Sequence, residues 1–302
     1  MKKYFINSSL RRRYTYMLGT LNPEQIYTTY KDNKHKFNTI TLKDYKQKES
    51  LLNALDLVDL DKHYNSEDIK VSVIMPTYNQ EKFIAKAIES ILNQKHENIE
   101  LIVVNDGSTD NTLNVINEIS DKYVGKKQIL ILNKENGGTG SAINEGLKHA
   151  SGKYVTWVSS DNEYFPDFIE TLTDILESQP DIDYAFSAFE WYSIPTGQSN
   201  ILNGFSGYQL TEGKYNKSYI KFGYDPGLCF LYRMDILNKL HFYDECQAED
   251  YLLVAKAGEF CEFYNTKKVL GRYNDHSETL SRKKPEETHK TEILAKQIAS
   301  KY

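Results

Sequence analysis

The chain has 302 residues, of which 40% are hydrophobic and 26% charged, so its composition is that of a globular protein with room for a sizeable core. A formal net charge of −5 argues against a nucleic-acid-binding protein, because such proteins carry a strongly basic surface. Three cysteines without a Cys-x-x-Cys pair argue against a disulfide framework or a zinc site, and they favour a reducing compartment.

Residues 1–69 are polar and rich in Lys and Tyr, and we interpret them as an N-terminal extension rather than an independent domain. Residues 49–60 (ESLLNALDLVDL) predict a short amphipathic helix in this extension. Its apolar stripe has two alternative partners, either the rest of the chain or a second subunit of a homo-oligomer. The basic run at residues 11–13 also has two interpretations, a contact with an acidic membrane surface or a solvated basic patch.

Membrane and export signals are missing from the sequence. Residues 1–13 are charged but lack a following apolar stretch, so they do not form a secretory signal. A run of about 18 apolar residues, which a membrane-spanning helix requires, does not occur. We therefore expect a cytoplasmic protein, with peripheral contact at the inner membrane face left open.

From residue 70 onward, apolar runs alternate with amphipathic stretches at a repeat of roughly 25–30 residues. The predicted strands are residues 71–75, 101–104, 129–132 and 154–158. The predicted helices are residues 81–93, 110–122, 138–150 and 166–178. Strands that are apolar throughout are covered on both faces, so the pattern indicates an α/β fold with a mostly parallel sheet. Ligands bind such sheets beyond the carboxyl ends of the strands.

The alternation becomes less regular after residue 183. Further strands are predicted at residues 183–191, 228–232, 260–264 and 267–273. Residues 249–257 predict a short helix, and residues 193–213 are rich in loop-forming residues. The last segment, residues 281–302, is charged and predicts a helical C-terminal tail to which we assign no chemistry.

The first two strand ends offer polar groups to a ligand. Residues 76–81 (PTYNQE) follow the first strand and combine an aromatic face with short polar side chains and a carboxylate. Residues 105–110 (NDGSTD) follow the second strand, where Gly107 permits a tight turn and Asp110 or a neighbour can cap the next helix. Asp106 precedes this turn and is not needed as a cap, so we expect it to be free to hydrogen-bond a ligand.

The third and fourth strand ends add a glycine-rich turn and a carboxylate. In residues 133–140 (NKENGGTG), glycines such as Gly138 at a helix start let backbone amides approach a phosphate or a sugar, although Gly-Gly is also a common turn. This is not a Walker loop, because no Gly-Lys-Ser/Thr follows at the required spacing. Asp161 follows the fourth strand, and a carboxylate there is costly unless it is paired or binds a metal. A divalent cation that neutralises a diphosphate fits this requirement.

In order and spacing, these strand ends resemble the family 2 glycosyltransferases with the GT-A fold. The segments that carry the resemblance are VSVIMPTYNQEKFIAKAIESILNQ, IELIVVNDGSTDNT and NKENGGTGSAINEGLKHASGKYVTWVSSDNEYFPDF. Further on, CFLYRMDILNKL and FYDECQAEDYLLVAKAGEF are similar to the second half of that family, including its Glu-Asp motif. The resemblance covers residues 70–280 and implies a GT-A domain there, with a Rossmann-like, mostly parallel sheet flanked by helices, between the extension and the tail.

The resemblance implies an inverting, hexosyltransferase-type enzyme that uses a nucleotide-sugar donor, with a UDP-sugar expected. The acceptor hydroxyl would belong to a glycan, a lipid-linked glycan or a protein. On this basis Thr77, Tyr78 and Asn79, with Glu81 nearby, hold the nucleotide base, and Asp106 contacts the base or the ribose. A nucleotidyltransferase is disfavoured, because those enzymes carry a basic, glycine-rich loop where this chain has PTYNQE.

The same resemblance implies a site for Mn²⁺ or Mg²⁺ and the diphosphate after the fourth strand. The family's Asp-x-Asp-like motif reads Ser159-Ser160-Asp161-Asn162 here, so one carboxylate, Asp161, is retained. Fewer carboxylates weaken metal affinity, and Ser160 is left to hydrogen-bond the ribose or a metal-bound water. Related enzymes use a late His or basic residue on the metal or diphosphate, which points to His276 or Arg272, with an isolated surface histidine as the alternative.

The resemblance implies that the general base lies in the Glu-Asp pair, Glu249 and Asp250. Inversion requires a base that removes the proton of the acceptor hydroxyl, and we assign this role to Asp250 with Glu249 in support, the reverse assignment being open. Aromatic side chains at residues 183–232 are candidates for the acceptor site, although their alternating spacing is also typical of core residues. The competing interpretation of the whole chain is a degenerate, non-catalytic GT-A subunit that serves as a binding or scaffolding partner.

Overall fold

The computed structural model describes residues 69–125, 127–202, 212–222, 228–237, 249–279 and 285–301. The predicted N-terminal extension with its helix, apolar stripe and basic run lies outside the described residues. The side chains of six residues that belong to described helices are also outside the description: Phe222, Leu237, Glu249, Pro285, Glu287 and Thr288.

A single mixed sheet forms the centre of the described part, in the order β3-β2-β1-β4-β9-β6-β10-β5. Its first half is parallel and consists of β1 (Val71–Thr77), β2 (Ile99–Asp106), β3 (Gln128–Lys134) and β4 (Tyr154–Trp157). The carboxyl ends of these strands lie at one edge, as the alternation of apolar runs predicts.

The second half of the sheet mixes directions. It contains β5 (Glu163–Tyr164), β6 (Tyr184–Ser193), β7 (Ser199–Leu202), β8 (Gly213–Lys214), β9 (Phe230–Arg233) and β10 (Phe263–Asp275). Strand β9 lies antiparallel to both β4 and β6, whereas β10 pairs with β6 in parallel. The expected α/β sheet is therefore confirmed, but its parallel arrangement is continuous only from β3 to β4.

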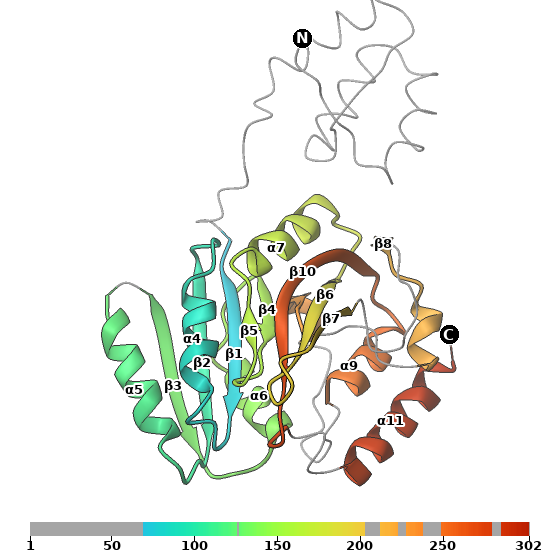
Figure 1. Cartoon of the computed structure of the whole chain (residues 1–302). Coiled ribbons are helices and arrows are strands. Elements are labelled where there is room, and N and C mark those ends of the chain that lie inside the picture. The colour runs from blue at the N-terminus through green and yellow to red at the C-terminus, as the bar shows by residue number, and fades with distance from the viewer. Residues whose placement is uncertain are drawn as a thin grey trace, which may run out of the picture. The chain divides into compact units, whose positions relative to one another are not determined.

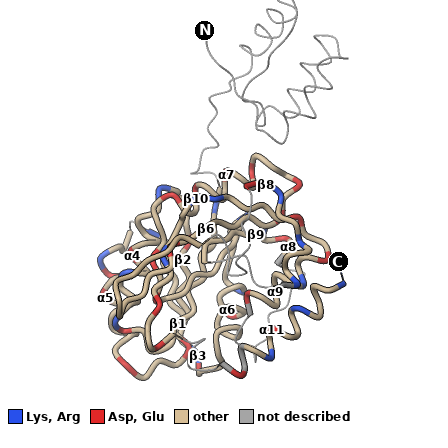
Figure 2. The backbone as a smooth tube through the Cα atoms, turned by 45° about the vertical axis from the view of Figure 1, so that its right-hand side comes forward, with Lys and Arg blue, Asp and Glu red and all other residues tan. Residues whose placement is uncertain are grey.

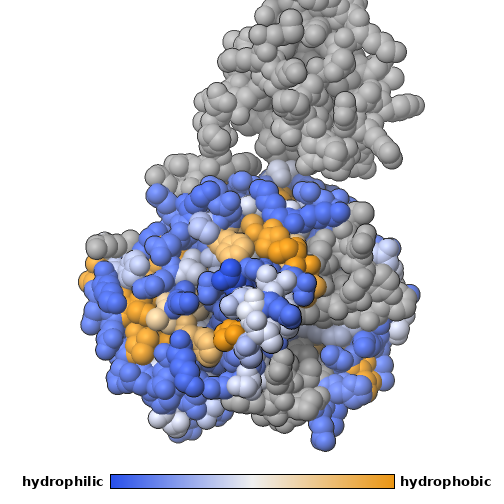
Figure 3. Space-filling model, viewed as in Figure 1, coloured by the Kyte–Doolittle hydropathy of each residue, from blue (hydrophilic) through white to orange (hydrophobic). Residues whose placement is uncertain are grey.

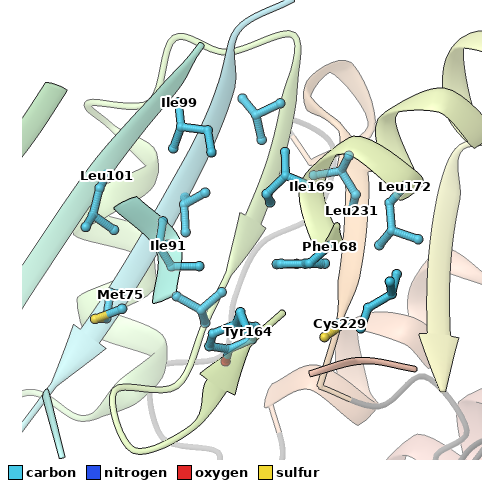
Figure 4. Packing of buried hydrophobic residues seen from close by; sticks show 14 of the residues in the cluster. Met75, Ile91, Ile99, Leu101, Tyr164, Phe168, Ile169, Leu172, Cys229 and Leu231 are labelled. Carbon is cyan, nitrogen blue, oxygen red and sulfur yellow. The ribbon is translucent and has the colours of Figure 1, made fainter. Parts of the chain in front are cut away.

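Helices cover both faces of the sheet (Figure 1). They are α4 (Ile84–Leu92), α5 (Thr112–Tyr123), α6 (Thr139–Leu147), α7 (Phe168–Ser178), α8 (Met234–Leu237), α9 (Glu249–Ala257) and α11 (Pro285–Ala299), with a 3₁₀ helix at Lys217–Phe222. One apolar cluster joins α4, α5 and α7 to the sheet, and a second joins α6, α9 and α11 to its other face. Figure 4 shows part of the first cluster, from Met75 and Leu101 to Phe168 and Leu231.

Strand alternation decides which cluster each residue joins, because successive side chains point to opposite faces. On β2, Leu101 and Val103 belong to the first cluster, while Ile102 and Val104 belong to the second. The same rule places Trp157, the last residue of β4, on the face covered by α9. Helices α9 and α11 lie side by side on that face (Figure 1).

The structure differs from the sequence prediction in several details, among them the short strands β5, β7 and β8, which were not predicted. Pro76 does not end β1, which continues to Thr77, because the missing N–H of Pro76 points to the side where β4 has already ended at Trp157. The strands predicted at residues 260–264 and 267–273 are one strand, β10, whose register shifts twice against β6. Strand β3 is not covered on both faces, because it lies at the sheet edge, where Leu130 is 39% exposed.

The surface of the described part is mixed in charge and hydropathy. Figure 2 shows acidic and basic residues interspersed over the described elements. Figure 3 shows small apolar areas bordered by hydrophilic residues on the face in view. Among the described helices, none combines the length and the apolar character that a bilayer crossing would require.

Candidate active site

The loop after β1 contributes Thr77, Tyr78 and Asn79. Thr77 is buried, and its hydroxyl oxygen has no hydrogen-bond partner among the described residues. Tyr78 is 46% exposed and presents an unburied ring at the carboxyl edge of the sheet. An orphaned hydroxyl beside an exposed aromatic face is the arrangement expected of a site that awaits a planar, polar ligand.

Asn79 connects this loop to the loop after β2. Its side-chain oxygen accepts hydrogen bonds from the backbone N–H groups of Thr109 (2.8 Å) and Asp110 (3.4 Å). Its own N–H donates to the hydroxyl of Ser108 at 3.0 Å. Its φ angle of 52° is a left-handed conformation that Asn tolerates better than most residues. Its amide oxygen is therefore committed to holding two loops together, and only its amide donors remain for the predicted contact with a nucleotide.

Glu81 also acts between these loops. Its carboxylate accepts the backbone N–H of Asn111 at 2.9 Å, at the start of α5. Its own N–H donates to the carboxylate of Asp110 at 3.2 Å. Asp110 in turn accepts the N–H of Thr112 at 3.0 Å, but it lies one residue before the N-cap position, which Asn111 occupies. Glu81 thus stabilises a helix N-terminus next to the predicted nucleotide site.

Asp106 is not free, which corrects the sequence prediction. One carboxylate oxygen accepts hydrogen bonds from the Lys134 ammonium (2.7 Å) and the N–H of Gly137 (3.0 Å), and the other accepts the N–H of Gly138 (2.8 Å). The residue is only 3% exposed, so these partners compensate a buried charge. A carboxylate accepts about four hydrogen bonds, which leaves room for one further donor from a ligand.

The same contacts correct the role of Gly138. Its backbone N–H donates to Asp106 and is therefore taken before any phosphate or sugar arrives. Its φ angle of 85° explains why glycine occupies the position before α6, because a side chain is strained in that conformation. The turn after β3 is thus built to dock on Asp106.

The turn after β4 is tied to the end of β10. The side-chain oxygen of Asn162 accepts the N–H of Asn274 at 2.9 Å, and the Asn274 amide donates to the carbonyl of Asp161 at 2.8 Å. Ser160 and Asn162 are buried in this turn, and Asp161 is partly buried. The end of β10, more than 100 residues later in the sequence, therefore holds the turn that carries the Asp161 carboxylate.

His276 contacts Asp161 directly. Its Nε2 lies 3.3 Å from a carboxylate oxygen of Asp161, and its ring stacks on Phe83 with centroids 4.4 Å apart. The backbone N–H of Glu278 donates to Nδ1 of His276 at 3.2 Å. Because Nδ1 accepts, a neutral ring carries its proton on Nε2 and donates it to Asp161. The buried ring is therefore no isolated surface histidine, and in this tautomer it orients Asp161.

A divalent cation fits this turn only if Asp161 and the diphosphate of the substrate bind it together. The described residues contain no group of three or more His, Cys, Asp or Glu side chains arranged to hold a metal ion. Asp161 is one carboxylate, and Mg²⁺ commonly binds through one or two carboxylates together with substrate phosphates. The donor set therefore fits a cation that arrives with a diphosphate. Ligation by Nε2 of His276, the predicted role, requires the proton to move to Nδ1 and the bond from Glu278 to break.

Asp250 lies near the start of α9 and faces the end of β4. The indole N–H of Trp157 donates a hydrogen bond to Oδ1 of Asp250. Burial raises the pKa of Asp250 from 3.8 to about 6, even though the Trp157 hydrogen bond lowers it. The residue as a whole keeps partial solvent exposure, so the carboxylate is desolvated but can be reached. A carboxylate with this pKa is suited to accept a proton near neutral pH.

Arg272 pairs with two other carboxylates, those of Glu190 and Glu163. Its Nε donates to Glu190 at 2.8 Å, a second nitrogen lies 3.7 Å from Glu163, and its guanidinium lies 5.2 Å from the ring centroid of Tyr192. Of the two late residues proposed for the metal or diphosphate, the structure thus brings His276 to Asp161 and commits Arg272 to an ion-pair network.

The aromatic residues proposed for the acceptor site divide in two groups. Phe189 is fully buried in the first apolar cluster, so it is a core residue. Trp191 and Tyr192 on β6 are partly exposed and remain candidates. Phe205 and Tyr208 lie outside the described residues.

Sequence reasoning missed three contributors to the site. Trp157 was counted as part of an apolar run, although a buried indole N–H needs an acceptor and thereby signals a polar partner. Lys134 is the last residue of β3 and gives no local sign of its partner, Asp106. Asn274 is identified only by the fold, because the strand pairing of β10 places it beside the turn after β4.

Comparison with protein families gives an independent identification. The family model described as glycosyl transferase family 2 matches residues 72–241, which is more than half of the chain. The chain therefore belongs to glycosyl transferase family 2. This confirms the family expected from the strand-end motifs.

Similar proteins come from several bacteria. Glycosyltransferase GlyA of Streptococcus pneumoniae is 36% identical over 183 residues, which cover 58% of this chain and 26% of the relative. The minor teichoic acid biosynthesis protein GgaB of Bacillus subtilis is 34% identical over 188 residues, covering 61% of this chain and 20% of the relative. The chain thus spans about a quarter or less of the length of these two relatives.

Solved structures share the fold. TarS residues 1–349 of S. aureus in complex with UDP-GlcNAc has a TM-score of 0.61 and 24% identity, with 75% of this chain and 65% of that chain covered. The mannosyltransferase PcManGT of Pyrobaculum calidifontis, in complex with GDP-Man and Mn²⁺, has a TM-score of 0.55 and 17% identity, with 70% and 58% covered. The expected GT-A fold is thereby confirmed.

Proposed function

We propose that this protein is an inverting glycosyltransferase that moves a hexosyl group from a nucleoside diphosphate sugar to a hydroxyl group of a glycan, a lipid-linked glycan or a protein. The observation that carries the proposal is a pair of carboxylates in different environments at the end of β4. Asp161 is held by the turn and by His276, whereas Asp250 is desolvated and has a pKa of about 6. The charges of both carboxylates act on the buried phenol of Tyr164 and help to raise its pKa, which supports treating them as one site.

The donor side of the site is the loop after β1. The exposed ring of Tyr78 and the orphaned hydroxyl of Thr77 support a role in binding the base of a nucleotide. UDP is the expected nucleotide. Because TarS and PcManGT hold UDP-GlcNAc and GDP-Man on the same fold, a donor test has to include both bases.

In the proposed step, the ionised carboxylate of Asp250 removes the proton of the acceptor hydroxyl. That oxygen forms a bond to the anomeric carbon from the face opposite the diphosphate, so the configuration inverts. The bond between the anomeric carbon and the diphosphate oxygen breaks, and its electron pair leaves with the nucleoside diphosphate. The products are the new glycoside, the nucleoside diphosphate and a protonated Asp250.

The second requirement of the reaction is to neutralise the negative charge on the leaving diphosphate. Asp161 is the side chain that would hold a divalent cation, and His276 keeps its carboxylate in place. A bound cation would neutralise part of the negative charge that develops on the diphosphate. Ser160, buried beside Asp161, is proposed to hydrogen-bond the ribose or a water on the cation.

Calorimetric titration tests the donor half of the proposal. UDP and GDP are titrated into the full chain with and without Mn²⁺ or Mg²⁺, and UDP binding that strengthens with the cation is expected. Asp161→Asn should remove the strengthening by the cation and keep the cation-independent part. If neither nucleotide binds under any condition, the result favours the alternative, a GT-A subunit that acts as a binding or scaffolding partner.

A transfer assay tests the catalytic half. With a UDP-sugar that binds, Asp250→Asn is expected to abolish transfer and donor hydrolysis while UDP affinity stays within about threefold. The preserved affinity separates loss of the base from loss of the fold. Full activity of Asp250→Asn would remove Asp250 from the mechanism and leave Glu249 as the base to test.

A further inference from the structure

The indole of Trp157 is aimed at one oxygen of Asp250. Its N–H donates to Oδ1, and this is the only hydrogen bond that the Asp250 carboxylate accepts within the described part of the chain. Trp157 is 5% exposed and ends β4, the strand that leads into the turn of Asp161. A buried indole N–H requires an acceptor, so this contact serves both groups.

The ring of Trp157 is fixed by its neighbours on β9. It stacks on Tyr232 with centroids 5.6 Å apart and an interplanar angle of 14°. Phe230 meets the indole at 4.6 Å with its ring tilted by 68°, close to an edge-to-face contact. Tyr232 is held in turn by Tyr184, whose ring centroid lies 4.1 Å away. Because Phe230 and Tyr232 are also buried, the indole has little freedom to rotate and its N–H direction is set by the core.

We propose that Trp157 is the positioning residue of the general base: it holds Oδ1 of Asp250 and leaves Oδ2 as the oxygen that takes the proton from the acceptor hydroxyl. This inference rests on the proposed function, in which Asp250 is the base. A base acts only when its oxygen lies within hydrogen-bond reach of the proton that it removes. The fixed indole restricts the rotation of a carboxylate that has one side-chain partner, and it thereby directs the second oxygen.

The electrostatic effect of the contact has a definite sign. Burial raises the pKa of Asp250, and the Trp157 hydrogen bond opposes that rise because it favours the charged form. Of the described groups, Tyr164 and Tyr232 feel the charge of Asp250. Both phenols have a pKa raised well above 10, mainly by burial, so they stay neutral throughout the working range. Removal of the indole N–H should therefore raise the pKa of Asp250.

The first experiment tests the Trp157–Asp250 hydrogen bond and needs no activity assay. The chain contains two tryptophans, so protein labelled with ¹⁵N-Trp gives two indole N–H resonances, and Trp191→Phe assigns them. The Trp157 resonance should shift with a midpoint near pH 6 when the pH is raised from about 4.5 to about 8. In Asp250→Asn the resonance should not titrate. A Trp157 signal that is independent of pH in the wild type, or that titrates equally in Asp250→Asn, overturns the contact.

The second experiment measures the positioning role. Trp157→Phe keeps an aromatic ring against Phe230 and Tyr232 but lacks the donor. We expect its kcat to fall about 10-fold or more, with the donor KM nearly unchanged. In the plot of kcat against pH, the acidic limb should move to higher pH. The matched control is Tyr251→Phe, which deletes the 2.6 Å hydrogen bond from α9 to the carbonyl of Ile220 but leaves the Asp250 carboxylate alone.

The outcomes separate this inference from the function on which it rests. A Trp157→Phe variant with wild-type kcat and wild-type pH profile overturns the positioning role, even if Asp250→Asn is inactive. An equal shift of the pH limb in Tyr251→Phe assigns the effect to general loosening of α9 and also overturns it. If the wild type transfers no sugar, the proposed function and the base role fail together, while the NMR midpoint still decides the Trp157–Asp250 contact. If Trp157→Phe does not fold, the NMR titration of the wild type and of Asp250→Asn decides whether the Trp157 N–H bonds the Asp250 carboxylate, and a signal that does not titrate overturns the positioning role.

Discussion

The desolvated carboxylate of Asp250 should make the protein less stable at neutral pH than it would be without it. Burial raises the pKa of Asp250 from 3.8 to about 6 against the opposing hydrogen bond from Trp157. The two values differ by about 2, and a difference of 1 corresponds to about 1.4 kcal/mol. The ionised group therefore costs the folded state up to about 3 kcal/mol above pH 7. Partial exposure of the residue reduces this cost, and we expect Asp250→Asn to raise the free energy of unfolding by about 1–3 kcal/mol at pH 7.5.

The pH dependence follows from the direction of this shift. Since the folded-state pKa exceeds the unfolded one, the folded protein binds more protons between about pH 3.8 and about pH 6. The stabilising contribution of protonated Asp250 is complete below that window and is lost as the pH rises through it. Asparagine does not titrate, and its amide oxygen still accepts the Trp157 N–H. The gain from Asp250→Asn should therefore shrink below about 1 kcal/mol near pH 4.

Urea unfolding followed by circular dichroism at about pH 7.5 and about pH 4 measures both values. Asp121→Asn is the matched control, because it makes the same chemical change at an exposed position on α5 and should leave the midpoint nearly unchanged. Asp250→Asn that is equally stable or less stable than the wild type at pH 7.5 would refute the reasoning. A gain that persists undiminished at pH 4 would do the same, because it would not come from ionisation.

Further predictions concern the two linked loops and the Asp161 turn. Asn79→Ala removes the hydrogen bonds between the loops and places at a positive φ a residue that tolerates it poorly, so urea titration should show a free energy of unfolding lower by about 1–3 kcal/mol. Asn79→Gly removes the same hydrogen bonds without the strain and should lose less. Equal losses in the two variants would contradict the strain argument. Asp106→Asn should cost about 1–3 kcal/mol in the same assay, because one carboxylate oxygen that accepts a part-buried backbone N–H is replaced by a donor. His276→Ala should weaken the cation-dependent part of UDP binding about 10-fold in calorimetry and leave the cation-independent part unchanged; unchanged cation dependence would remove His276 from the site.

The sequence determined the fold class and the family, and it directed attention to one candidate site. Apolar runs and helical stripes predicted strands β1 to β4 and helices α4 to α7 within a few residues, because periodicity is a local property of the chain, but they did not predict the two-residue strand β5. The rule that ligands bind beyond the carboxyl ends of parallel strands directed attention to Asp106, Asp161 and the neighbouring loops. The helix at residues 249–257 was also correct in both bounds.

Only the tertiary structure decided what each polar side chain does. Asp106 was expected to be free, but strand order brings Lys134 and a glycine turn next to it, and a buried carboxylate takes the donors within its reach. Asn79 similarly bonds to a loop about 30 residues away. Hydrogen bonds between distant segments depend on strand pairing, which a local pattern does not contain.

Trp157 and His276 illustrate the same division. The sequence selected Asp250 and Asp161 by their motifs, and it offered His276 or Arg272 as the late residue on the metal or diphosphate. The end of β10 brings His276 to Asp161, while the pairing of β10 with β6 puts Arg272 beside Glu190. The face on which Trp157 lies follows from strand alternation, but its partner on α9 follows from helix packing 93 residues later. Residue type and spacing thus determined which groups are available for chemistry, and packing between distant elements decided which of them meet.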